Sequence, residues 1–94
     1  MKELKLIAKV ENLQTVLEFI DNELENAGCP MKVQMQIDVA VEELFVNVAN
    51  YAYAPATGEV TVRIDVESMP KKAVISPGGH SFPAVIQVDV FRIA

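Results

Sequence analysis

Residues 41–67, VEELFVNVANYAYAPATGEVTVRIDVE, contain the patterns of a helix, a turn and a strand in succession. Apolar side chains recur at a helical period for about five turns after Pro30, which predicts a long helix that ends before Pro55. The residues that follow Pro55, Ala-Thr-Gly, favour a turn. Residues 59–67 then alternate apolar with polar side chains, the pattern of a strand with one buried and one solvated face. The centre of the fold is therefore a helix followed directly by a half-buried strand.

The segments on either side predict further elements of the fold. Residues 2–8 alternate and predict an opening strand. A first helix is expected between Asn12 and Gly28, which are residue types typical of an N-cap and a C-cap. Residues 73–76 predict a second strand. Because only a short turn separates them from residues 59–67, an antiparallel hairpin between the two is favoured.

Residues 83–94 alternate again and predict a last strand. A chain of 94 residues is long enough for one small domain with one core, and not for two. We therefore expect an α+β fold in which two helices pack on one face of a mainly antiparallel sheet.

The composition limits the classes of protein to consider. Apolar residues make up 51% of the chain and charged residues 22%, proportions that favour a folded chain over a disordered one. The net charge of −5, without a basic cluster, argues against nucleic acid as a partner. The apolar runs are too short to span a bilayer, and the N-terminus lacks the apolar region of a secretory signal. With Cys29 as the lone cysteine, these features predict a cytoplasmic protein without a disulfide.

Two further expectations concern side chains of the helices. Met31 and Met35 are expected to fill the core, since methionine adapts to irregular gaps. The acidic clusters at residues 21–25 and 38–43 are expected to be solvated helix faces, with Glu43 as a candidate site residue instead.

Glu43, Asn47 and Asn50 form a polar stripe on the long helix, because their spacing places them within about 60° of one another. A buried amide without a partner costs roughly 1–3 kcal/mol, so asparagines on a helix this apolar need backbone, water or a ligand as partner. In one interpretation the asparagines tie neighbouring loops and Glu43 is solvated. In the other, a carboxylate and a carboxamide oxygen one turn apart hold a hydrated magnesium ion at the phosphates of a nucleotide. The same carboxylate could also act as a general base.

The stretch of residues 41–67 resembles the N-box helix and following strand of the GHKL (histidine kinase-like) ATPase superfamily, most closely its branch of anti-sigma-factor serine kinases. The N-box of this family has Glu, then Asn four residues later, then His or Tyr four residues beyond. Glu43, Asn47 and Tyr51 occupy these positions here. The resemblance implies that Asn47 coordinates magnesium, that Glu43 is the catalytic base, and that Asn50 and Tyr51 line the nucleotide site.

The resemblance also implies an activity and partners. It describes a regulator of transcription that binds ATP with Mg²⁺ and, as a serine/threonine kinase, phosphorylates a serine on an antagonist protein. The implied partners are a sigma factor and an anti-anti-sigma-type antagonist, with a homodimer as a further assembly. Phosphoryl transfer of this kind depends mainly on positioning and on charge neutralisation by the metal.

After Ser76 the chain departs from the family pattern. The family has an Asp-x-Gly motif here, whose aspartate recognises the adenine amino group, but the chain has no acidic residue between Glu67 and Asp89. Gly78 or Gly79 stands for the glycine of that motif, and Gly79 is the candidate for the nucleotide site. Losing a hydrogen bond to the base typically costs 1–3 kcal/mol, which predicts weak and poorly selective ATP binding.

The chain ends at Ala94, before the glycine-rich lid of the family. We therefore interpret residues 1–94 as one histidine kinase-like ATPase domain that is C-terminally incomplete, with residues 1–76 well matched and residues 77–94 divergent. One hypothesis is a truncated or frame-shifted remnant of a longer kinase-like protein. The other is a natural short form whose last strand completes the sheet or pairs with the edge of a partner. The alternative function is a non-catalytic protein-binding module that has lost nucleotide binding.

Overall fold

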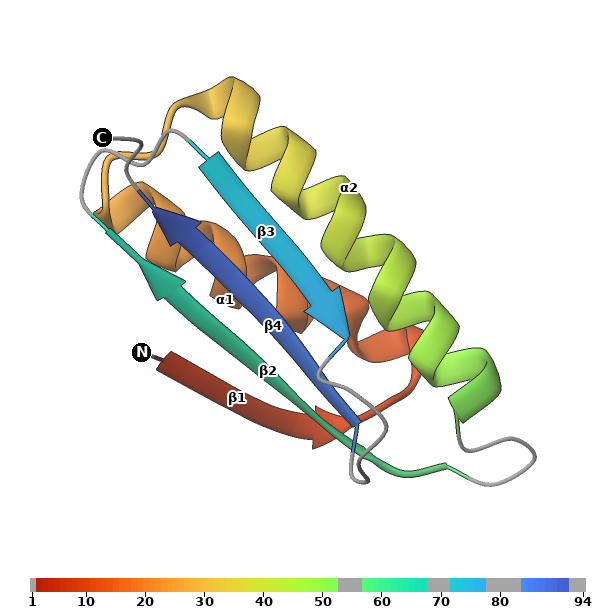
Figure 1. The fold of residues 1–94 in the computed structure, drawn as a ribbon. Helices are drawn as coiled ribbons and strands as arrows, with labels where there is room; N and C mark the ends of the chain where they lie inside the picture. The colour runs from red at the N-terminus through yellow and green to blue at the C-terminus, as the bar shows by residue number, and fades with distance from the viewer. Residues whose placement is uncertain (1, 53–56, 68–71, 78–83, 92–94) are drawn as a thin grey trace.

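Two helices cover one face of a four-stranded sheet in the part of the chain that this computed structural model describes, which is residues 2–52, 57–67, 72–77 and 84–91 (Figure 1). The strands are β1 (Lys2–Ile7), β2 (Glu59–Val66), β3 (Lys72–Pro77) and β4 (Ala84–Phe91). The helices are α1 (Leu13–Asn26) and α2 (Met31–Asn47), with a 3-10 turn η1 (Val10–Asn12) before α1 and a π-helical turn η2 (Val48–Ala52) after α2. The fold is the α+β arrangement predicted from the sequence. Neither helix in the described residues is long and apolar enough to cross a membrane.

The order of the strands in the sheet is β1-β2-β4-β3, so β4 lies between β2 and β3 (Figure 1). β2 pairs antiparallel with β1 and parallel with β4, and β3 pairs antiparallel with β4. The predicted hairpin between residues 59–67 and 73–76 is therefore wrong. Its physical reason is burial: on the face that packs against the helices, Ile86 and Val88 of β4 are fully buried, whereas Ala73 and Ile75 of β3 are only partly buried, so β4 takes the central position and β3 the edge.

The core lies between the helices and one face of the sheet. Each strand contributes every second residue to it, and each helix contributes residues three or four positions apart, as the two backbone periods require. The fully buried side chains of the helices and of the two central strands are Val16, Ile20, Leu24, Ile37, Val41, Phe45, Val60, Val62, Ile64, Ile86, Val88 and Val90. The strand predicted at residues 83–94 is observed over Ala84–Phe91, between β2 and β3, and supplies a quarter of this set.

The turn between α1 and α2 stops the first helix by a specific backbone geometry. Gly28 has φ +77°, the left-handed conformation that glycine adopts without steric cost. Its N–H donates to the Glu25 carbonyl at 3.1 Å, and the N–H of Cys29 donates to the Leu24 carbonyl at 3.0 Å. These two bonds form a Schellman motif and satisfy the last carbonyls of α1. The role predicted for Gly28 as a helix C-cap is confirmed.

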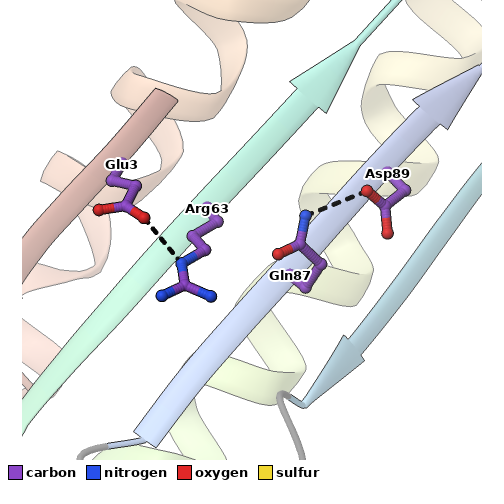
Figure 2. A network of polar contacts seen from close by, with 4 residues as sticks. All are labelled: Glu3, Arg63, Gln87 and Asp89. Atoms are coloured by element: carbon purple, nitrogen blue, oxygen red, sulfur yellow. Dashed lines mark hydrogen bonds and ion pairs between the residues drawn. The ribbon is translucent and has the colours of Figure 1, made fainter. Parts of the chain in front are cut away.

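The other face of the sheet is polar and carries no helix in the described residues. Figure 2 shows Arg63 of β2 donating from Nε to Oε1 of Glu3 on β1, at 2.8 Å, and Gln87 of β4 donating to Asp89 at 3.0 Å. Glu3 and Arg63 are direct cross-strand neighbours. Because both side chains are about 40% exposed, the ion pair adds little to stability, at most about 1 kcal/mol. The sheet is therefore covered on one side only, as its alternating pattern predicted.

The central position of β4 can be tested by truncating one of its side chains. Ile86→Ala should lower the free energy of unfolding by about 2–5 kcal/mol, because it removes a fully buried side chain and leaves a cavity. Val74→Ala on the edge strand, at a half-exposed side chain, should cost well under about 1 kcal/mol. Urea unfolding of both variants measures the difference. Equal effects would contradict the burial of β4 between its neighbours.

Candidate functional site

A hollow of about 490 Å³ lies on α2, on the side of the helix turned away from the core. Among the described residues it is lined by Val39, Glu42, Glu43, Val46 and Asn47. These positions follow one another at three- and four-residue steps, so they share one face of the helix. The residues that α2 buries lie on its opposite face, which fixes the direction in which the hollow opens.

Glu43 and Asn47 meet in this hollow, as the sequence predicted. They are one helical turn apart on α2, and both side chains are exposed to solvent. Asn47 and Asn50 are both exposed and not buried, so water, one of the partners expected from the sequence, can satisfy their amides. Their hydrogen-bonding groups are therefore accessible to a ligand.

The structure does not bring Asn50 and Tyr51 into the same hollow. Both lie in the π-helical turn η2, and Tyr51 is 75% exposed. A π turn closes its hydrogen bonds over five residues and so rotates the side chains that follow away from the 3.6-residue pattern. The continuous helical period predicted as far as Tyr51 therefore ends at Asn47. Gly79, the remaining residue predicted for the nucleotide site, lies outside the described residues.

Three lining residues were not predicted as site residues from the sequence. Val39, Glu42 and Val46 complete the hollow around Glu43 and Asn47. Val39 lies four residues before Glu43, and Val46 lies three residues after it, so a helical projection centred on Glu43 would have found both. Glu42 was assigned to a solvated acidic cluster, and it is indeed exposed. Its position beside the hollow places a second carboxylate at the site.

The donor atoms of the hollow suit a magnesium ion bound together with phosphates. Mg²⁺ takes oxygen ligands, keeps several waters, and is commonly held by one or two carboxylates plus substrate phosphates. Glu42, Glu43 and Asn47 provide carboxylate and carboxamide oxygens. No group of three or more His, Cys, Asp and Glu side chains in the described part of the chain forms an all-protein metal cage. The volume of the hollow falls within the roughly 300–1,000 Å³ range of small-molecule sites.

The electrostatics of the hollow impose a condition on any phosphate ligand. Two exposed carboxylates, Glu42 and Glu43, lie next to each other in it. Their charge repels a bare polyphosphate, and a divalent cation between them and the phosphates reverses this effect. The hollow therefore favours a nucleotide that arrives together with its metal ion over a bare one.

Other expectations about α2 and its neighbours need correction. Met31 and Met35 were expected in the core, but they are 64% and 60% exposed on α2. The core-facing side of α2 is filled by other apolar residues, which leaves the methionines on the solvent side. Asp21 and Asp38, which were expected in solvated faces, are only partly exposed.

Comparison with known proteins identifies the family of the chain. Residues 6–87 match the family model of the histidine kinase-like ATPase domain. The match begins in β1, includes α2 with Glu43 and Asn47, and ends within β4. No curated protein and no solved structure matches the chain. A match over most of the chain, together with the α+β fold, shows that this protein belongs to the histidine kinase-like ATPase domain family, the ATP-binding superfamily that its N-box resembles.

Proposed function

We propose that the protein is an ATP-binding regulator of the anti-sigma-factor serine kinase type, which uses the hollow on α2 to bind ATP with Mg²⁺ and transfers phosphate to a serine of an antagonist protein. One observation carries the proposal: Glu43 and Asn47 both line an open hollow on α2, a helix that lies within the matched residues 6–87 and resembles the family's N-box. The partners that follow from this proposal are a sigma factor and its antagonist protein.

Asn47 has the role of a metal ligand in this proposal. Its carboxamide oxygen is exposed in the hollow and carries no charge, so it can contact Mg²⁺ without adding to the charge of the two neighbouring carboxylates. When bound, the ion neutralises charge on the phosphates during transfer. Glu42 attracts the cation from the rim of the same hollow.

Glu43 has the role of general base. Its carboxylate is exposed one turn before Asn47, so it is accessible to a hydroxyl group brought to the hollow by a partner protein. A base in this position takes the proton of the serine hydroxyl or of a water molecule as the phosphoryl group is transferred. Val39 and Val46 add apolar surface to the lining of the same hollow.

A second candidate function rests on a specific feature of the sequence. No acidic residue lies between Glu67 and Asp89, where the family has its adenine-binding aspartate. A domain without this contact can keep its fold and its protein-docking surfaces after nucleotide binding has been lost. The alternative is therefore a non-catalytic protein-binding module.

Titration calorimetry with ATP, with and without Mg²⁺, separates the two functions. We expect binding only when Mg²⁺ is present, because the carboxylates of the hollow repel the bare nucleotide. Asn47→Ala should weaken binding at least about tenfold, the effect of losing one charge-assisted contact of roughly 1.5–3 kcal/mol.

The matched control is Asn22→Ala, which removes an exposed asparagine of α1. It should bind as the unchanged protein does. Both asparagines are exposed, so neither variant should shift the free energy of unfolding by more than about 0.5 kcal/mol. An absence of heat at millimolar ATP with Mg²⁺ would reject the kinase proposal in favour of the binding module.

Nucleotide selectivity tests the missing adenine contact. We expect ATP and GTP to bind with Kd values within about tenfold of each other, because the hydrogen bond that distinguishes the two bases in the family is absent. Competition between the two nucleotides, with Mg²⁺ present in both arms, measures the ratio. A preference for ATP of a hundredfold or more would show that another group recognises adenine.

The role of Glu43 is tested by removing its charge. Glu43→Gln should lower the rate of phosphate release from Mg-ATP by about a hundredfold or more, the usual contribution of a general base, while ATP binding is kept. Glu25→Gln, at an exposed carboxylate of α1, is the control and should keep the full rate. A Glu43→Gln variant with unchanged turnover would remove Glu43 from the proposed mechanism.

A further inference from the structure

Asp21 of α1 and Asp38 of α2 face each other across the interface between the two helices. Both side chains are partly buried, and the Oδ1 atom of each is buried without a hydrogen-bond partner. Two ionised carboxylates cannot satisfy each other, since each only accepts hydrogen bonds. If one of them carries a proton, its O–H can donate to the other. One proton shared between the two carboxyl groups would therefore supply the hydrogen-bond donor that the pair lacks.

No cation neutralises this pair among the described residues. Asp21 approaches Asp38 from α1, and the Cys29 thiol lies near it from the turn between the helices. The strands under the helices present apolar side chains, such as Val62, Ile64 and Val88. The ion pair in the described part of the chain, Arg63 with Glu3, lies on the opposite face of the sheet. Within the described residues, a shared proton is therefore what balances the charge of the pair.

The titration behaviour of Asp38 agrees with this geometry. Burial, and then the neighbouring carboxyl group of Asp21, raise the pKa of Asp38 to about 7, from the ordinary value of 3.8. Burial, and to a smaller extent the charge of Asp38, also raise the pKa of the Cys29 thiol. The thiol thus remains protonated at neutral pH. Of Cys29 and Asp38, Asp38 is the group that changes charge near neutral pH.

We infer that Asp21 and Asp38 share one proton and form a pH-sensitive latch between α1 and α2, closed below neutrality and loosened above it. In the closed state the proton joins the two helices by a hydrogen bond. In the open state two negative charges face each other at a partly buried position, so the helices are pushed apart. The latch depends on the helix interface alone and does not require nucleotide binding.

The direction of the pH dependence follows from proton linkage. Between pH 3.8 and about 7 the folded protein holds a proton on Asp38 that the unfolded chain has released. The pair's contribution to stability is therefore fully present at the acidic end of this range and is lost as the pH rises through about 7. Above that pH the repulsion is complete and the contribution is at its lowest.

Thermal unfolding of Asp38→Asn against pH tests the latch. The asparagine amide can donate to Asp21 at every pH and so imitates the protonated state. At pH 8 the variant should unfold at a temperature about 5 °C or more above that of the unchanged protein, and the difference should shrink steadily as the pH is lowered toward 4. Glu25→Gln on α1 makes the same charge change at an exposed position and should show no such pH-dependent difference. A difference that does not change with pH would overturn the proposal.

A titration of the unchanged protein provides a readout that does not depend on how the variant folds. The carboxyl carbon signal of Asp38, followed by NMR, should titrate with a midpoint near 7. Amide hydrogen exchange at the facing turns of α1 and α2 should accelerate across the same pH range, beyond the intrinsic increase measured for the exposed end of β1. A midpoint near 4, or exchange at the helix interface that follows the intrinsic increase, would exclude a shared proton.

Discussion

Ile37, Val41 and Phe45 are buried almost completely against the sheet, and their packing fixes the rotation of α2 about its own axis. Burial of each such side chain contributes roughly 1.5–3 kcal/mol. A rotation of the helix that exposed all three would therefore cost a free energy comparable to much of the stability of a small domain. Every other feature of α2 follows from this constraint. The residues on the opposite side of the helix then face outwards, and they include Glu43 and Asn47.

The sequence predicted the elements well because each is encoded by a local period. The helical spacing of residues such as Val16, Ile20 and Leu24, and the alternation of β2 and β4, are repeated over enough residues to be read without tertiary information. Strand order is not a local property. The alternating pattern of residues 73–76 indicates that one side of the strand is buried, but not which strand it pairs with. The more apolar β4 lies beside β2, the position that was predicted for β3.

The candidate site was predictable to the same extent and for the same reason. Glu43 and Asn47 are four residues apart inside a regular α-helix, so helix geometry alone brings them together. Asn50 and Tyr51 lie beyond Asn47, in a π-helical turn that no period in the sequence announces. The exposure of Met31 and Met35 was missed because apolar character alone does not show which side of α2 is buried; that side holds Gln34, Ile37, Val41 and Phe45. The contact between Asp21 and Asp38 joins two helices, and such contacts leave no mark in either helix's own pattern.

The carboxylates of α2 show how solvent access decides what an acidic side chain does. Glu42 and Glu43 are neighbours with like charge, but both are exposed, and water screens their repulsion to a small cost. Both carboxylates are therefore accessible to a cation in the hollow. Asp38, on the same helix, is partly buried and faces a second carboxylate, so its repulsion is screened less. The core fixes the rotation of α2 and so decides the environment of its acidic residues. Glu42 and Glu43 are exposed and can bind a cation, whereas Asp38 is partly buried and holds a proton.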